Sequence, residues 1–171
     1  GLIITHHPII FHPLKRLNSA SVVERCVEQA IKHDIALYAC HTNLDAAEGG
    51  MSWRVGEMLG LTRMEVLAPA TDGVTGFGVV GELPSAEPSE GFMRRVMELF
   101  EVQSLRHSDM VRSEVRRVAI CTGAGRSNIA DALAAEADLY ITADLRYNDF
   151  MLGENRMELA DIGHFASEFC A

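Results

Sequence analysis

Short apolar runs with the character of β-strands alternate along the chain with segments whose apolar residues recur at helical spacing. The predicted strands cover residues 2–5, 35–40, 66–67, 76–81, 115–121, 139–142 and 159–162. The predicted helices cover residues 19–33, 51–61, 89–100, 127–136 and 147–155, and a further helix begins at His164. This alternation is typical of an α/β fold with a largely parallel sheet.

One stretch breaks the alternation. Residues 68–88 are rich in proline and glycine and contain only one short β-prone run. We interpret this stretch as a crossover between two sub-lobes.

The length and the ends of the chain bear on its domain organisation. With 171 residues, of which 48% are hydrophobic, the chain predicts a single domain over residues 1–171. It begins at Gly1 inside an apolar run and stops at Ala171 in what reads as the opening of a helix. We therefore expect a fragment of a longer protein.

Charge and cysteine usage narrow the class of protein. A net charge of -9 disfavours contacts with nucleic-acid phosphates. No apolar run is long enough to span a membrane. The cysteines Cys26, Cys40, Cys121 and Cys170 are scattered and form no CxxC pair, which favours a reducing, cytoplasmic location.

The first cluster of chemically useful residues follows the first predicted strand, where His6 and His7 stand between Thr5 and Pro8. Neighbouring residues of an extended chain point in opposite directions. The two imidazoles therefore suit two ions better than one. The alternative interpretation is a polar turn with two exposed histidines.

Two more clusters follow later predicted strands. His41 and Asp45 are four residues apart, and so are His164 and Glu168. On a helical turn each pair lies on one face. Asp45 would then bind a metal or orient a histidine that does, and Glu168 would bind one ion or bridge two. The alternatives are an ordinary turn at Asp45 and an exposed helical pair at Glu168.

The clusters are more informative together than singly, because ligand sites of parallel sheets lie beyond the carboxyl ends of the strands. They supply two carboxylates and four histidines, namely Asp45, Glu168, His6, His7, His41 and His164. Such a set suits two transition-metal ions, drawn from zinc, iron, manganese and nickel. The expected cofactor is a pair of divalent ions that activates water and holds a substrate.

Two weaker signals lie in the second half of the chain. Gly123-Ala124-Gly125 stands between a predicted strand and a predicted helix, so it is either a tight turn or an anion-binding loop. Asp144 follows another strand, as either a helix cap or a wall of the same cleft.

Three segments carry a resemblance to a known family: residues 4–11 around His6-His7-Pro8, residues 37–45 with His41-Thr42-Asn43-Leu44-Asp45, and residues 161–168 with Gly163-His164 and Glu168. They resemble the dinuclear-metal-centre family, also called NGG-one-interacting-factor-like. Many bacterial members carry the name GTP cyclohydrolase I type 2 homolog. The resemblance runs from Leu2 to Glu168.

The resemblance implies two similar, intertwined α/β lobes with largely parallel or mixed sheets and a metal site at the lobe interface. It implies a ring-shaped homohexamer, and chain segments before Gly1 and after Ala171. The residues that match the family's metal ligands are His6, His7, Asp45, His164 and Glu168. The resemblance also makes His41 a histidine of the site.

Two functions follow as hypotheses. The first is a metal-dependent hydrolase acting on a nucleotide or another small phosphorylated substrate, with His41 or Glu168 as the catalytic group that moves the proton. The second is a non-catalytic, metal-binding regulatory or scaffold protein that acts through partners. Neither hypothesis involves nucleic acid or a membrane.

Overall fold

The structure is a computed structural model, and it describes residues 1–169. Cys170 therefore lies outside the described residues. The chain divides into two compact units, Gly1–Leu44 and Asp45–Ala171. No helix among residues 1–169 combines the length and the apolar character needed to cross a membrane.

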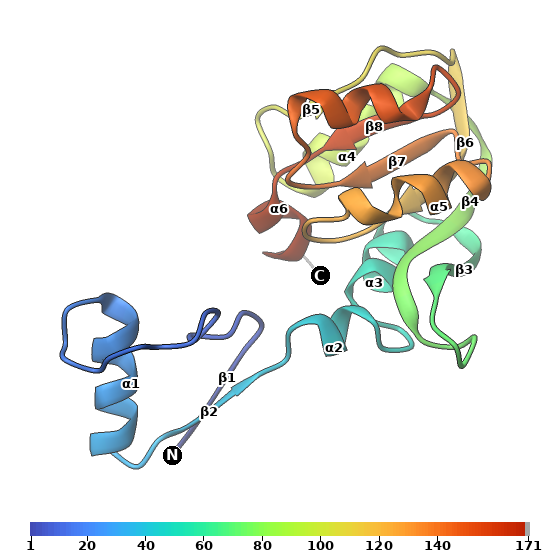
Figure 1. Cartoon of the computed structure of the whole chain (residues 1–171). Coiled ribbons are helices and arrows are strands. Elements are labelled where there is room, and N and C mark those ends of the chain that lie inside the picture. The colour runs from blue at the N-terminus through green and yellow to red at the C-terminus, as the bar shows by residue number, and fades with distance from the viewer. Residues whose placement is uncertain (170–171) are drawn as a thin grey trace. The chain divides into compact units, whose positions relative to one another are not determined.

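The first unit is a two-stranded parallel sheet with one connecting helix (Figure 1). Strand β1 (Leu2–Thr5) pairs with β2 (Ala36–Ala39), and α1 (Val22–Lys32) lies between them in the sequence. A parallel pair needs such a crossover. Both predicted strands and the predicted helix are confirmed.

The start of α1 is fixed by local hydrogen bonds. Ser21 Oγ caps the helix by accepting a hydrogen bond from the Glu24 backbone amide at 3.2 Å. The Glu24 carboxylate accepts the amides of Asn18 and Ala20 at 3.1 and 3.0 Å. The Asn18 amide in particular lowers the pKa of Glu24, with a smaller opposing effect of burial. One buried carboxylate thus anchors the end of the long loop that follows β1.

The second unit is built on a six-stranded sheet in the order β3-β4-β6-β7-β8-β5, within the described residues. Its central strands β6, β7 and β8 are parallel, and the other neighbours are antiparallel. The mixed α/β sheet, one of the predicted alternatives, is therefore confirmed. The strands are β3 (Thr62–Pro69), β4 (Gly76–Pro88), β5 (Arg106–His107), β6 (Glu114–Ile120), β7 (Leu139–Thr142) and β8 (Glu158–Asp161).

The predicted crossover at residues 68–88 is wrong, because this stretch forms most of an antiparallel hairpin, β3–β4. The reversal is local. The Asp72 carboxylate accepts the amides of Val74 and Thr75 at 3.0 and 2.9 Å, and Gly73 adopts a left-handed conformation with φ 69°. The glycines and prolines mark a turn and a long bent strand.

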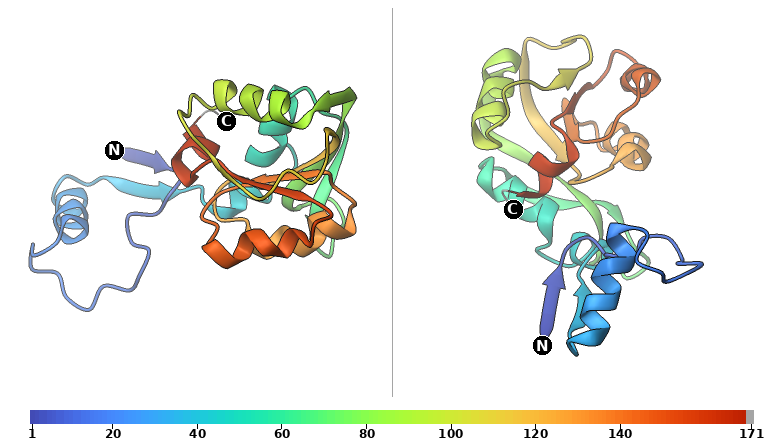
Figure 2. Two further views of the ribbon diagram at one scale, coloured as in Figure 1. Left: turned by 90° about the horizontal axis from the view of Figure 1, so that it is seen from above. Right: turned by 90° about the vertical axis from the view of Figure 1, so that its left-hand side faces the viewer.

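Helices cover both faces of this sheet (Figure 2). α3 and α4 pack on one face, and α5 with the 3₁₀ helix η2 packs on the other. The helical elements of the chain after residue 41 are α2 (Thr42–Asp45), α3 (Met51–Met58), α4 (Ser89–Leu99), the 3₁₀ helix η1 (Arg126–Asn128), α5 (Ile129–Ala134), η2 (Tyr147–Gly153) and α6 (His164–Phe169).

Each face has its own hydrophobic core, and successive strand residues enter opposite cores. Val118 and Ile120 of β6 join the core beneath α3 and α4, whereas Ala119 joins the core beneath α5. The central strands β7 and β8, covered on both faces, are consequently buried at every residue. Their carboxyl ends open on one edge of the sheet, where the loops of the candidate site begin.

Candidate metal centre

Three imidazoles lie together in the first unit. His6 and His7 follow β1, and His41 follows β2, so the parallel pairing brings both strand ends to one edge. The ring centroids of His6 and His7 are 4.8 Å apart, and His41 lies 5.6 Å from His6 and 5.2 Å from His7. The structure thus brings together residues that are more than thirty positions apart in sequence.

The protonation pattern of His6 is fixed by a backbone contact. Its Nδ1 lies 2.8 Å from the Cys40 carbonyl oxygen. A carbonyl only accepts, so Nδ1 carries the hydrogen and donates it. In the neutral ring Nε2 then keeps its lone pair, which is the state a metal ligand needs.

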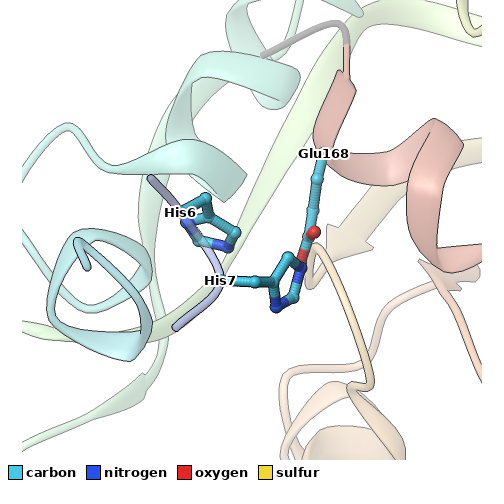
Figure 3. A group of neighbouring side chains, drawn as sticks. All are labelled: His6, His7 and Glu168. Atoms are coloured by element: carbon cyan, nitrogen blue, oxygen red, sulfur yellow. The ribbon is translucent and has the colours of Figure 1, made fainter. Parts of the chain in front are cut away.

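Figure 3 labels three of the proposed ligands and shows which elements carry them. His6 and His7 come from the segment directly after β1, and their ring planes meet at 78°. Glu168 comes from α6 in the second unit. Ligating nitrogens of the two histidines lie within 4.8 Å of each other. The first unit therefore presents adjacent nitrogen donors from a single turn.

A second set of groups lies in the second unit, around His164 at the start of α6. Its Nε2 is 2.9 Å from Glu168 Oε1, which confirms that the four-residue spacing places both on one face of the helix. Its Nδ1 is 2.7 Å from Asp144 Oδ2. Asp144 stands in the loop after β7 with a left-handed φ of 58°. The imidazole is held between two carboxylates.

These carboxylates determine the proton affinity of His164. Burial, the largest single influence, lowers its pKa, but the hydrogen bonds and charges of Asp144 and Glu168 together outweigh it. The net result is a raised pKa. A position that attracts a proton between two carboxylates also attracts a metal cation.

Gly123 leaves space for the side chains of His164 and Glu168. It lies in the loop after β6 with φ 67°, a conformation that favours glycine. A Cβ at this position would lie 2.8 Å from Glu168 Oε1 and 3.4 Å from His164 Nε2. The loop passes close to the carboxylate and the imidazole only because the residue has no side chain.

Hydrogen bonds to the hydroxyl groups of buried residues fix the conformation of the Gly123–Gly125 loop. The Gly123 amide donates to Ser167 Oγ and the Gly125 amide to Thr142 Oγ1, each at 2.9 Å. The Tyr140 hydroxyl donates to the Gly125 carbonyl at 2.7 Å. Because both glycine amides already donate hydrogen bonds within the protein, the structure favours a tight turn rather than an anion-binding loop.

Asp45 ends the helical turn α2 and begins the second unit. Its charge acts on Cys121, whose pKa is raised to about 11, mainly by burial and further by Asp45, against a lowering hydrogen bond with Tyr140. Asp45 thus lies near the carboxyl end of β6, the edge that also carries the Gly123 loop.

Some parts of this arrangement were not predicted. Asp144 was left open between a helix cap and a cleft wall, and the structure makes it the partner of His164. The supporting hydroxyls of Thr142 and Ser167 were not identified at all. Thr142 sits at the end of a predicted strand, but no local pattern indicates that its side chain points toward a loop. The meeting of the two sets of ligands stays a prediction.

Comparison with known proteins places this geometry in context. The family model described as Duf34/NIF3 (NGG1p interacting factor 3) matches residues 1–171. A Streptococcus pneumoniae relative named GTP cyclohydrolase 1 type 2 homolog is 36% identical over 170 residues, covering 96% of this chain and 63% of the relative. A Clostridium perfringens protein of the same name is 31% identical over 172 residues, covering 98% and 65%.

Solved structures agree on the fold. A Bacillus cereus protein related to NIF3 superposes with a TM-score of 0.88 at 23% identity, covering 97% of this chain and 73% of the other. HcgD from Methanocaldococcus jannaschii, in its reduced form, gives a TM-score of 0.79 at 24% identity, with 99% and 65% covered. The chain spans 65% and 63% of the length of the Clostridium perfringens and Streptococcus pneumoniae relatives.

Proposed function

Because the chain belongs to the Duf34/NIF3 family, we propose that it binds two divalent transition-metal ions and hydrolyses a nucleotide or another small phosphorylated molecule. The ions would be zinc, iron, manganese or nickel. The proposed ligands are His6 and His7 from the first unit, with Asp45, His164 and Glu168 from the second.

The donor chemistry of the chain fits such a pair of ions. The observation that carries the proposal is that each unit holds an incomplete ligand set: clustered imidazoles in one, and an imidazole between carboxylates in the other. Three imidazoles would supply nitrogen ligands, and two carboxylates would offset part of the charge of two divalent ions. Gly123 keeps the approach to Glu168 and His164 clear of a side chain.

The chain's own residues have distinct tasks in this proposal. When bound, the two ions would lower the pKa of a water molecule and polarise the substrate. Glu168 would take up and release the proton, and His41, 5.2 Å from His7 by ring centroids, is the alternative proton carrier. Asp144 would hold the His164 ring in one orientation by accepting its Nδ1 hydrogen.

The names of the relatives suggest the first substrate to test. Proteins 31–36% identical to this chain are called GTP cyclohydrolase 1 type 2 homologs, and GTP is a nucleotide of the proposed class. The family description also contains the words "interacting factor", which matches the second hypothesis of a regulatory or scaffold protein. One experiment distinguishes the two functions.

Purified chain of known metal content is incubated with GTP, other nucleotides and small phosphate esters, and product is followed by chromatography. We expect turnover that falls at least about a hundredfold in His6→Ala and in Glu168→Ala, because removal of a ligand disables the ions. His33→Ala changes an exposed histidine whose ring hydrogen-bonds the Gln29 side chain, and serves as the control.

Absence of turnover across this panel, with metal retained, would contradict the hydrolase and support the non-catalytic alternative. Equal turnover in wild type and Glu168→Ala would place the reaction outside the proposed site.

A further inference from the structure

A cavity of about 430 Å³ lies within the second unit, between the first turn of α3 and the β3–β4 hairpin. Its lining includes Asp45, Glu48, Trp53, Glu65 and Val74. Small-molecule sites have volumes in this range. Asp45 is also a proposed metal ligand, so the cavity adjoins the place where the proposed chemistry would occur.

The walls of the cavity are fixed by hydrogen bonds. The Ser52 hydroxyl, in the first turn of α3, lies 3.1 Å from Thr122 Oγ1 and accepts the Thr122 amide at 3.1 Å. On the hairpin side, the Gly76 amide donates to the Ala46 carbonyl at 3.0 Å. These contacts tie both walls to the rest of the unit, so the cavity exists before a ligand enters.

The charge of the lining selects the kind of group that enters. Asp45, Glu48 and Glu65 are all acidic, and the lining residues include no lysine or arginine. Glu65 is bound by Arg117 Nη2 at 2.8 Å. Glu48 makes no hydrogen bond or ion pair within residues 1–169. The lining therefore repels phosphate groups and offers an uncommitted carboxylate to N–H donors.

Trp53 adds a planar apolar surface to the same lining. Its side chain is half-buried and packs against the core beneath α3. An indole favours contact with a flat ring. The cavity thus combines an aromatic surface with a carboxylate acceptor, a pairing that suits a planar heterocycle carrying adjacent N–H groups.

We propose that this cavity binds the base of a guanine nucleotide, which deepens the proposed function and rests on it. Guanine presents a ring N–H beside an exocyclic amino group, and the two oxygens of the Glu48 carboxylate accept one hydrogen bond each. The ring lies against Trp53. The phosphates stay outside the acidic lining, and Asp45 connects the base to the metal side of the pocket.

The test measures binding of guanosine, which lacks phosphate, to the purified chain by calorimetry, with adenosine as the competing base. Metal content is determined on the same samples. We expect guanosine to bind at least about tenfold more tightly than adenosine, because adenine lacks the paired donors that a carboxylate accepts.

Two variants alter the cavity without touching the proposed ligands. Glu48→Gln should weaken guanosine binding about tenfold and remove the preference over adenosine, since a charge-assisted hydrogen bond is lost. Val74→Trp fills the cavity from an exposed position on the hairpin and should abolish binding. Glu57→Gln, an exposed glutamate of α3 paired with Arg54, is the matched control and should bind as wild type.

The results separate this proposal from the proposed function. A chain that holds metal and turns over nucleotide, but does not bind guanosine or is unaffected by both variants, overturns the base site alone. A chain without metal that binds guanosine and loses it in Glu48→Gln and Val74→Trp supports the base site and contradicts the metal centre.

Discussion

At the scale of the residue, Asp144 determines which nitrogen of His164 faces Glu168. Asp144 Oδ2 lies 2.7 Å from His164 Nδ1, and this contact directs the other ring nitrogen, Nε2, toward Glu168 Oε1 at 2.9 Å. Asp144→Ala should lower metal affinity about ten- to a hundredfold, because the ring loses its orientation. Titration with zinc and a competing chelator measures the change. Asp109→Ala, at an exposed loop position, should bind as wild type, and equal affinities in all three proteins would contradict the role of Asp144.

Gly123 offers a second test, with a control for backbone strain. Gly123→Ala should impair metal retention, since the new Cβ would meet Glu168 Oε1 at 2.8 Å. The control is Gly60→Ala, because Gly60 has a similar φ of +75° but open space around its Cβ position. Both variants should lose about 1 kcal/mol of unfolding free energy through strain. Metal retention measured on each separates the effects, and identical retention would mean that the contact with Glu168 is unimportant.

Sequence reasoning was strongest for residues whose position follows from strand ends. The grouping of His6, His7 and His41 needs only two parallel strands, and the contact of His164 with Glu168 needs only one helical turn. The contact of His164 with Asp144 could not be predicted. Asp144 belongs to a different loop, and its left-handed backbone directs the side chain in a way that no local pattern encodes.

At the scale of the element, β8 carries a buried acid whose ionisation opposes folding. The Glu158 side chain is fully buried, and its pKa is raised by burial, partly offset by the Arg112 amide. A raised pKa means that the folded state holds the proton more tightly. This stabilising contribution is complete below the unfolded pKa, near 4.5, and disappears as the pH rises through the folded pKa.

Glu158→Gln should therefore gain on the order of 1 kcal/mol of unfolding free energy relative to wild type near neutral pH. The gain should vanish in acid near the unfolded pKa, where the wild-type carboxyl is protonated. Urea unfolding at the two pH values measures the difference, with the exposed Glu154→Gln as control. An effect of Glu158→Gln that is the same at both pH values would refute the assignment.

Element prediction succeeded where periodicity is regular and failed where pairing is decided at a distance. The strand Leu139–Thr142 has the predicted bounds, because every residue of it is buried. β3 and β4 are longer than predicted, because the ends of β3 pair with β4 and the far end of β4 pairs with β6 at Glu87 and Pro88. The two-residue strand β5 exists only through its pairing with β8 and has no signal of its own.

At the scale of the whole molecule, the sequence indicated the class of fold and the family, and the fold and family are confirmed. The ligand sets belong to separate units, residues 1–44 and 45–171. Strand ends explain each set within its unit, but no pairing rule or spacing connects one unit to the other. The shared metal centre and the ring-shaped hexamer that the resemblance implies stay predictions.

The central claim is that both units contribute ligands to one pair of ions, and metal stoichiometry tests it most directly. Elemental analysis of chain purified without chelators should give about two divalent ions per chain. His6→Ala, in the first unit, and His164→Ala, in the second, should each lose most of this metal, while His33→Ala keeps it. A wild-type value near zero, or a metal content unchanged by both ligand variants, would contradict the account.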